Sequence, residues 1–139
     1  MQDRFKFRYN NNNKIYDVSA IDFTRSGGEI VSLDKHETLM CKLDLNSLIQ
    51  CTGLKDKNGT LIYEGDIVHF YDDELLQTMK IIWDNDELDF KAIGLKKSVE
   101  CYEKDFFYLG YIKKEDSLEV IGNIYKNPEL LEVEDDRQN

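Results

Sequence analysis

The chain has 139 residues, 18 of them basic and 28 acidic, which gives a formal net charge of −10. A domain of this length buries roughly two thirds of its unfolded surface, so a core forms without disulfide bonds. The negative charge disfavours nucleic acid as a ligand. No window approaches the ~18 consecutive apolar residues of a membrane helix, and residues 1–5 contain no apolar run typical of a signal peptide. We therefore expect a soluble, cytoplasmic protein that is not exported and has no membrane contact.

The cysteines and histidines do not indicate a metal site. Cys41, Cys51 and Cys101 lie far apart and form no C-x-x-C motif, and His36 and His69 have no partner at metal-ligand spacing. An odd number of separated cysteines favours reduced, mostly buried thiols in a cytoplasm. The sequence thus predicts no metal and no cofactor.

Basic and aromatic residues alternate at the start of the chain. A strand sends successive side chains to opposite faces, which predicts an aromatic face in the core and a basic face outside. The basic stripe is a candidate partner-binding surface for phosphate or an acidic protein, although a solvated face that guards an edge strand accounts for it more simply. The aromatic residues are Phe5, Phe7 and Tyr9, and the basic residues are Arg4, Lys6 and Arg8.

Short strands and close turns follow. The strand candidates cover residues 14–18, 21–23 and 29–33, with a turn at Ser26-Gly27-Gly28. This spacing predicts antiparallel pairing. Residues 34–46 suit either a helical turn or a strand.

The stretch from Gln50 to Phe70 is the most informative about backbone structure. A hairpin turn is predicted near Asn58, because Asp accepts bonds from its own downstream backbone while Asn and Gly tolerate positive φ. Glu64-Gly65-Asp66 predicts a second turn, after which a strand begins at Asp66 or Ile67. The predicted turn motif comprises Gly53, Asp56, Asn58, Gly59, Tyr63, Glu64, Gly65 and Asp66.

Glu64 and Asp66 allow two interpretations. Carboxylates two residues apart are candidates for a general acid and base, which requires a cleft and separated pKa values. Alternatively they build the turn, in which Gly65 supplies unusual φ and Asp66 accepts backbone N–H bonds. Turn chemistry accounts for every residue of this segment, so we favour the structural interpretation.

A longer hairpin is predicted after an acidic turn at residues 72–74. Residues 75–83 form one strand, and Asp84-Asn85-Asp86 returns the chain into residues 87–93. One face of the second strand is expected to carry Leu88, Phe90 and Ala92. Trp83 is the only tryptophan and a candidate partner anchor, because tryptophan is enriched at interface hot spots, although a core position suits it better.

The end of the chain combines two strands and a short helix. Residues 106–112 are apolar and aromatic, which predicts a buried central strand. Residues 118–125 predict the last strand, in which Gly122, followed by Asn123, indicates a bulge or a close backbone approach. Asn127-Pro128-Glu129 predicts a short C-terminal helix with Asn127 as its cap. We expect one β domain over residues 1–131 and an acidic, disordered tail over residues 132–139.

Several of these stretches resemble the YopX family of phage and prophage proteins. QCTGLKDKNGTLIYEGDIV, residues 50–68, is similar to the family's central motif, although Cys51 stands where an aromatic residue is commoner. Lys6-Phe7-Arg8 near the start, and residues 120–125 and 127–131 near the end, also agree. The resemblance implies a viral context and a mainly β fold of coiled antiparallel sheets with an SH3-like barrel. It implies no reaction.

Sequence templates for catalysis are absent. The chain has no G-x-G-x-x-G, G-x-x-x-x-G-K, H-E-x-x-H or G-x-S-x-G segment, and spacing selects no Cys/His pair as nucleophile and base. We therefore expect a non-catalytic protein that binds a protein partner or a second copy of itself in the host cytoplasm. The alternatives are a nucleic-acid-binding barrel that uses the N-terminal basic strand, and an acidic DNA mimic that occupies a host nucleic-acid-binding protein.

Overall fold

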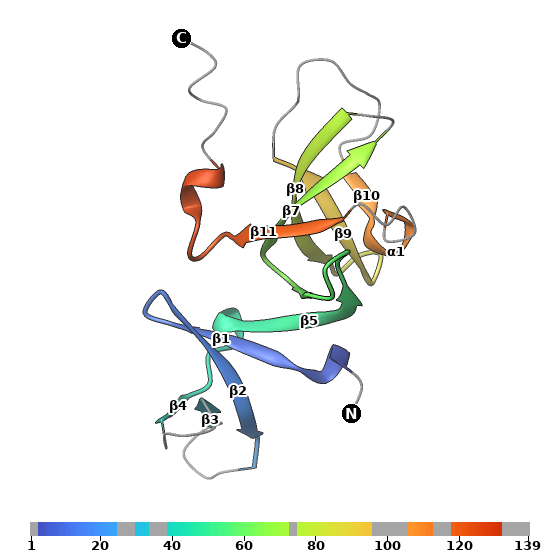
Figure 1. The fold of residues 1–139 in the computed structure, drawn as a ribbon. Coiled ribbons are helices and arrows are strands. Elements are labelled where there is room, and N and C mark those ends of the chain that lie inside the picture. Colours follow the sequence, from blue (N-terminus) through green and yellow to red (C-terminus); the bar gives the residue numbers. More distant parts are fainter. Residues whose placement is uncertain are drawn as a thin grey trace.

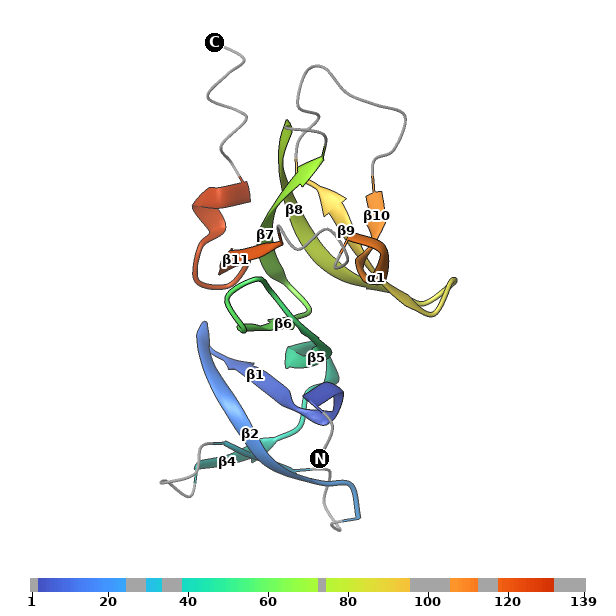
Figure 2. The same cartoon turned by 45° about the vertical axis from the view of Figure 1, so that its right-hand side comes forward.

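Two antiparallel sheets make up the fold of the computed structural model, which describes residues 3–24, 30–33, 39–72, 75–95, 106–112 and 118–131. The sheets lie one above the other (Figures 1 and 2). The mainly β prediction is thereby confirmed. The described strands form open sheets rather than a closed barrel, so the SH3-like barrel stays a prediction. Within the described ranges, no helix has both the length and the apolar character needed to cross a membrane.

The first sheet has six strands and is built from the N-terminal part of the chain. Its two predicted segments at residues 14–18 and 21–23 form one strand, β2, with a register shift between Val18 and Ala20. In spatial order the strands are β4 (Leu39–Lys42), β3 (Ile30–Leu33), β2 (Lys14–Asp22), β1 (Phe7–Asn11), β5 (Leu48–Lys55) and β6 (Leu61–Tyr63).

The second sheet has five strands, and the described part of the chain also contains four short helical turns. In spatial order its strands are β10 (Phe106–Tyr108), β9 (Asp89–Gly94), β8 (Leu75–Asp84), β7 (Asp66–Asp72) and β11 (Glu119–Asn123). The described helical turns are η1 (Asp3–Phe5), η2 (Leu45–Ser47), α1 (Leu109–Ile112) and η4 (Pro128–Leu131).

The N-terminal strand is shorter than predicted and lies inside its sheet. Residues 3–5 form η1 because the Lys6 N–H donates to the Asp3 carbonyl, 2.9 Å away, and the Lys6 ammonium pairs with the Asp3 carboxylate at 3.1 Å. Phe5 is consequently exposed, and the alternation of faces begins only at Phe7. Strand β1 pairs with both β2 and β5, so the expectation of a guarded edge strand is wrong.

The two central turns form where the sequence predicts them. The chain reverses between β5 and β6, with Gly59 at φ +81°, and β7 begins at Asp66 after Gly65 at φ +85°. Gly53, also at positive φ, lies at the register shift between Cys51 and Lys55. Backbone chemistry therefore explains the glycines of this segment.

Two predictions for the second sheet are wrong in detail. Leu88 lies in the turn before β9 rather than on its apolar face; it has φ +56° and is 72% exposed. Residues 106–112 do not form a central strand, because β10 is an edge strand of three residues and the chain continues as α1. Leu109 and Ile112, three residues apart, share the helical face that is buried. The helical period thus overrides the β propensity of the aromatic residues.

The main core lies on one face of the second sheet and includes Ile62 of β6 and Leu109 and Ile112 of α1. Two smaller clusters pack around Tyr9 and around Cys51 in the first sheet, so each sheet has its own apolar layer. The fully buried members of the main core include Ile62, Val68, Phe70, Met79, Ile81, Ala92, Leu109, Ile112 and Leu118.

The predicted bulge at Gly122 is confirmed, and Asn127 directly precedes η4, where its carbonyl rather than its side chain accepts the Leu130 N–H at 3.0 Å. The register of β11 shifts between Val120 and Gly122, and a Cβ on Gly122 would lie 2.5 Å from Asn127 Oδ1. That oxygen accepts the Asn123 N–H at 3.2 Å, so it binds back to the strand instead of capping η4. The Ser26-Gly27-Gly28 turn, His36, Cys101 and the predicted tail at residues 132–139 lie outside the described residues.

Candidate functional site

The β6–β7 corner, where the chain passes from the first sheet to the second, carries the acidic part of the predicted turn motif. The Gly65 N–H donates to the Ile81 carbonyl on β8 at 2.8 Å, and the Gly65 carbonyl accepts the Ile124 N–H at 2.9 Å. One glycine therefore joins the corner to β8 and to the segment after β11. Positive φ at this position suits glycine because a side chain would strain the backbone.

Replacing Gly65 with alanine is expected to destabilise the fold by about 2 kcal/mol, against about 1 kcal/mol for Gly59→Ala. Both glycines have positive φ, so both substitutions strain the backbone. At Gly65 the new Cβ would lie 3.0 Å from Tyr125 Cε2. At Gly59 no atom lies within 4 Å of the new Cβ. Urea denaturation of the two variants measures the difference, and equal losses would contradict a close approach at Gly65.

Asp66 is buried in this corner and is only 3% exposed. Its Oδ2 accepts the Tyr63 N–H at 2.8 Å. Burial raises the pKa of Asp66 to about 7, although the Tyr63 amide and the Arg8 guanidinium oppose that shift. Burial also raises the pKa of Glu64. The two carboxyls thus have perturbed pKa values, as an acid and base pair requires, but they still need a space for substrate.

The space beside the two carboxyls is too small for a substrate. Its volume is about 10 Å³, and Asp66, Glu64, Arg8, Tyr63 and Tyr125 are among its lining residues. A cavity of that size holds about one water molecule. Arg8 is also engaged there, because its guanidinium carbon lies 3.9 Å from the centre of the Tyr63 ring and its Nε lies 3.7 Å from Asp17 Oδ1. The corner is therefore a packed joint.

Asp56 binds three main-chain amides. Its Oδ1 accepts the Asn58 and Thr60 N–H groups at 2.8 and 2.9 Å, and its Oδ2 accepts the Val120 N–H at 2.9 Å. The carboxylate is 5% exposed. It closes the β5–β6 turn and ties that turn to β11, as the structural interpretation of this motif requires.

Asn123 has a similar role at the end of β11. Its Oδ1 accepts the Tyr125 N–H at 3.0 Å and the Lys126 N–H at 2.8 Å. The side chain thus fixes the turn that brings Tyr125 against Gly65.

Trp83 packs within its own hairpin. Its ring meets Phe90 edge to face with centroids 5.0 Å apart, and its Nε1–H donates to Asn85 Oδ1 at 2.7 Å. Nearby, the Lys91 ammonium bonds Asp84 at 2.7 Å, which raises the pKa of Lys91, and lies 4.2 Å from the centre of the Phe106 ring. These contacts stabilise the hairpin; a partner-anchor role for Trp83 stays a prediction.

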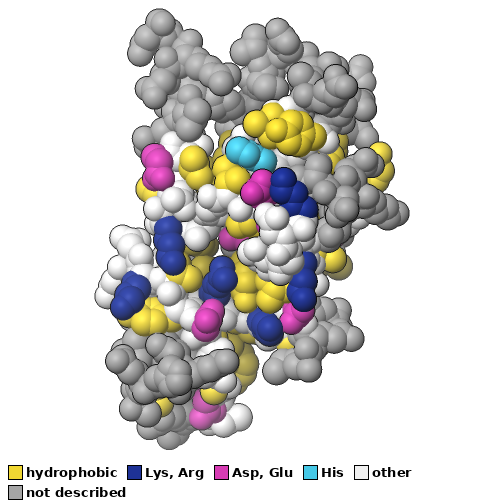
Figure 3. All heavy atoms as spheres, in the orientation of Figure 1, with side chains coloured by type: hydrophobic (Ala, Val, Ile, Leu, Met, Phe, Trp, Pro, Cys, Tyr) yellow, Lys and Arg dark blue, Asp and Glu magenta, His cyan; other side chains and the backbone are white. Residues whose placement is uncertain are grey.

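The predicted basic stripe is divided between different environments. Lys6 pairs with Asp3 and Arg8 stacks on Tyr63, while the side chain of Arg4 lies outside the described residues. Figure 3 shows basic side chains spread across the middle of one face, with acidic ones beside them. Lys57, for example, pairs with Glu119 at 3.2 Å. The structure therefore does not bring Arg4, Lys6 and Arg8 together as one free cationic surface.

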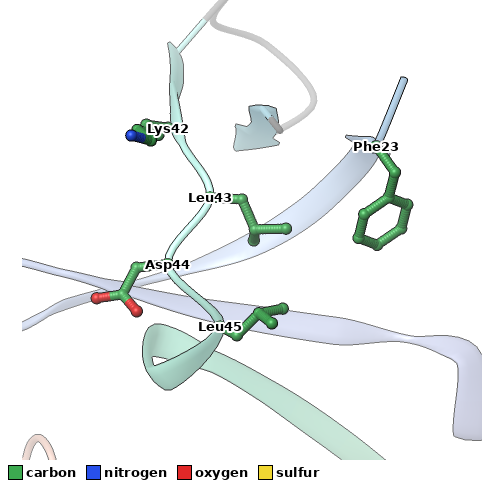
Figure 4. A pocket seen from close by; sticks show the side chains of 5 residues that line it. All are labelled: Phe23, Lys42, Leu43, Asp44 and Leu45. Atoms are coloured by element: carbon green, nitrogen blue, oxygen red, sulfur yellow. The ribbon is translucent and has the colours of Figure 1, made fainter. Parts of the chain in front are cut away.

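An apolar hollow lies at the outer end of the first sheet. Its volume is about 530 Å³, and it is lined by Phe23, Lys42, Leu43, Asp44 and Leu45. Phe23 and Leu45 are 63% and 69% exposed. The three apolar side chains point into one space, whereas Lys42 and Asp44 point away from it (Figure 4). This is the larger of the two hollows described, and its size falls in the range of ligand pockets, about 300–1,000 Å³.

Sequence reasoning missed this hollow. Phe23 ended a predicted strand, and residues 42–45 lay in the least readable stretch. The available signal was the alternation of charged Lys42 and Asp44 with Leu43 and Leu45, which indicates an extended segment with one apolar face. Nothing in the sequence placed Phe23 opposite that face.

Comparison with protein families confirms the sequence resemblance. A family model described as YopX protein matches residues 6–132. Among solved structures, the crystal structure of protein EF1440 from Enterococcus faecalis is similar, with 22% sequence identity and a TM-score of 0.45 over 91% of this chain and 96% of that chain. No curated protein matches the chain.

Proposed function

This chain belongs to the YopX family, and we propose that it is a non-catalytic phage or prophage protein that acts through protein contacts in the host cytoplasm. The use of the motif carboxylates supports the proposal: Asp56 binds three amides, and Asp66 faces a space of about 10 Å³. The proposed contact uses the outer end of the first sheet and does not depend on an SH3-like barrel.

The observation that carries the proposal is the position of the apolar hollow beside an edge strand. Strand β4 ends the first sheet, and no described strand pairs with its outer side. The chain runs directly from β4 into Leu43 and Leu45, which line the hollow. An exposed strand edge offers main-chain hydrogen bonds, and an adjacent pocket accepts a side chain of the added strand.

The occupant that fits is an extended segment of a partner protein with one apolar side chain. The segment would cross the end of the sheet from the free edge of β4 toward the end of β2, where Phe23 lies. Main-chain pairing with β4 would supply affinity, and insertion of the apolar side chain between Phe23, Leu43 and Leu45 would supply specificity. Lys42 and Asp44 carry opposite charges at the rim, so a segment with both signs matches this surface better than a strongly charged one.

Substitution of an apolar residue of the hollow by a charged one tests the contact. We expect Leu45→Glu to weaken binding of a partner captured from host lysate by at least about tenfold, because it places a carboxylate in the apolar hollow. Leu88→Glu is the matched control, since Leu88 is 72% exposed against 69% for Leu45 and lies on the far hairpin. Calorimetry with the purified partner measures both affinities, and amide shifts in β4 locate the contact.

Three outcomes would overturn the proposal. In the first, the Leu45→Glu variant binds the partner as tightly as the wild type does. In the second, the partner shifts amide signals only in strands other than β4. In the third, the wild type captures no protein and sediments as a monomer. Sedimentation of a dimer that Leu45→Glu dissociates would identify a second copy of the chain as the occupant instead of a separate partner.

Charge distribution favours an acidic DNA mimic as the second candidate. Residues 1–63 carry nine basic and eight acidic residues, whereas residues 64–139 carry nine basic and 20 acidic ones. The net charge of −10 therefore belongs almost wholly to the part that contains the second sheet. A segment with this excess of acidic residues attracts a nucleic-acid-binding protein rather than nucleic acid. Competition by duplex DNA for the captured partner separates this function from ordinary protein binding, and DNA titration at low salt tests direct binding.

A further inference from the structure

We propose that Asp66 forms a proton-linked joint between the two sheets, in which the uncharged carboxyl keeps the β6–β7 corner closed and its ionisation opens the corner to water. This inference concerns the motif corner and does not rest on the partner contact at β4. It assigns the central acidic residue of the motif a regulatory role in addition to building the turn.

The geometry of the corner disfavours a charged carboxylate. Asp66 is 3% exposed, and the adjacent space of about 10 Å³ has room for about one water molecule. A buried carboxylate needs several donors, and Asp66 has one donor in the described contacts, the Tyr63 N–H. Ionisation therefore creates a demand for water that the closed corner does not meet.

Charged and titratable groups around Asp66 come from several elements. Arg8 on β1 favours its ionisation, but Arg8 is partly neutralised by Asp17 on β2. Asp56 in the β5–β6 turn opposes ionisation, and Glu64 beside it lines the same space with a pKa that burial raises. Tyr63 and Tyr125 line the space as well, and burial raises the pKa of each phenol above its ordinary value.

The balance of these groups places the transition near neutral pH. Burial raises the pKa of Asp66 to about 7, so both forms of the carboxyl are populated there. The amides that would report opening are those of Gly65 and Ile124, which form the bonds at 2.8 and 2.9 Å that join the corner to β8 and to the segment after β11. The Tyr63 amide is not a reporter, because it donates to Asp66 itself and that bond is stronger to the charged carboxylate.

Amide hydrogen exchange of the whole chain, followed by NMR, tests the proposal. After correction for intrinsic rates, the Gly65 and Ile124 amides are expected to exchange about tenfold faster at a pH of about 8.5 than at about 5.5. Asp66→Asn keeps the shape and an acceptor oxygen but carries no charge, so it should abolish the difference. Asp86→Asn, in the exposed β8–β9 turn, is the control and should preserve it.

Carbon-13 titration of the Asp66 carboxyl in the wild type needs no variant. A midpoint near neutral pH supports the joint, and Arg8→Gln should move that midpoint to higher pH because the opposing cation is removed. A midpoint near the ordinary value of 3.8, or a pH dependence of exchange that survives Asp66→Asn, would overturn the proposal.

Discussion

Replacing Asp56 with alanine is expected to lower the free energy of unfolding by about 3–5 kcal/mol, because hydrogen bonds to a charged acceptor contribute about 1.5–3 kcal/mol each and are not fully additive. The carboxylate accepts three amide hydrogens from two separate parts of the chain. It is 5% exposed, so water does not readily replace it. The alanine variant leaves all three donors without this partner.

Urea denaturation measures the decrease in the free energy of unfolding, and two further variants serve as comparisons. Asp44→Ala removes a carboxylate that accepts a single amide, from Asn46, at an exposed site, so its expected cost is about 1 kcal/mol. Asp56→Asn keeps one carbonyl oxygen and should fall between the two. If Asp56→Ala cost no more than Asp44→Ala, the link between the β5–β6 turn and β11 would not stabilise the fold.

Local turn chemistry made the centre of the fold predictable. Asp56 accepts amides of the turn that follows it, and Gly59 and Gly65 adopt the positive φ that the two turns require, so the reversal near Asn58 and the start of β7 follow from the sequence alone. Gly122 indicated a bulge or a close backbone approach; the register shift of β11 confirms the bulge, and the Asn127 side chain lies where a Cβ would be. Where turn residues determine the backbone conformation locally, contacts with distant parts of the chain are not needed to predict it.

Distant contacts decide one of the remaining features. The run at residues 106–112 has strand propensity, yet Leu109 and Ile112 enter the core from a helical turn. The hydrophobic pattern within that run does not contain this information. Leu88 is different, because it leaves its predicted strand for a local reason: the β8–β9 loop extends to it, with Asp84 Oδ1 accepting the Asp86 and Glu87 N–H groups at 2.8 and 3.1 Å.

The candidate sites were predictable to different degrees. Asp56 and Asp66 accept main-chain amides, as expected for Asp residues in turns. The burial of Asp66 was not predictable, because it depends on Arg8, Tyr63 and Tyr125 meeting from different strands. The hollow at Phe23 likewise depends on β2 passing opposite residues 42–45.

Wild-type stability is expected to fall as pH rises from about 4 to about 7 relative to that of Asp66→Asn. The folded state keeps the Asp66 proton up to a pKa of about 7, whereas the unfolded chain releases it near 3.8. The folded state therefore binds more protons in this window, and stability decreases with pH. Each pH unit of that window contributes up to about 1.4 kcal/mol, so the total reaches about 2–4 kcal/mol.

Other carboxylates act in the opposite direction, which is why the comparison with Asp66→Asn is needed. Lys6 lowers the pKa of Asp3 and Lys91 lowers that of Asp84, so their stabilising effects are lost as pH falls. These contributions are common to the wild type and the variant and cancel in the difference. Denaturant unfolding across this pH range should show that the free energy of unfolding of the variant increases relative to that of the wild type from acid to neutral pH. A difference that stays constant would mean that Asp66 titrates alike in the folded and unfolded states, and the corner would then tolerate its charge.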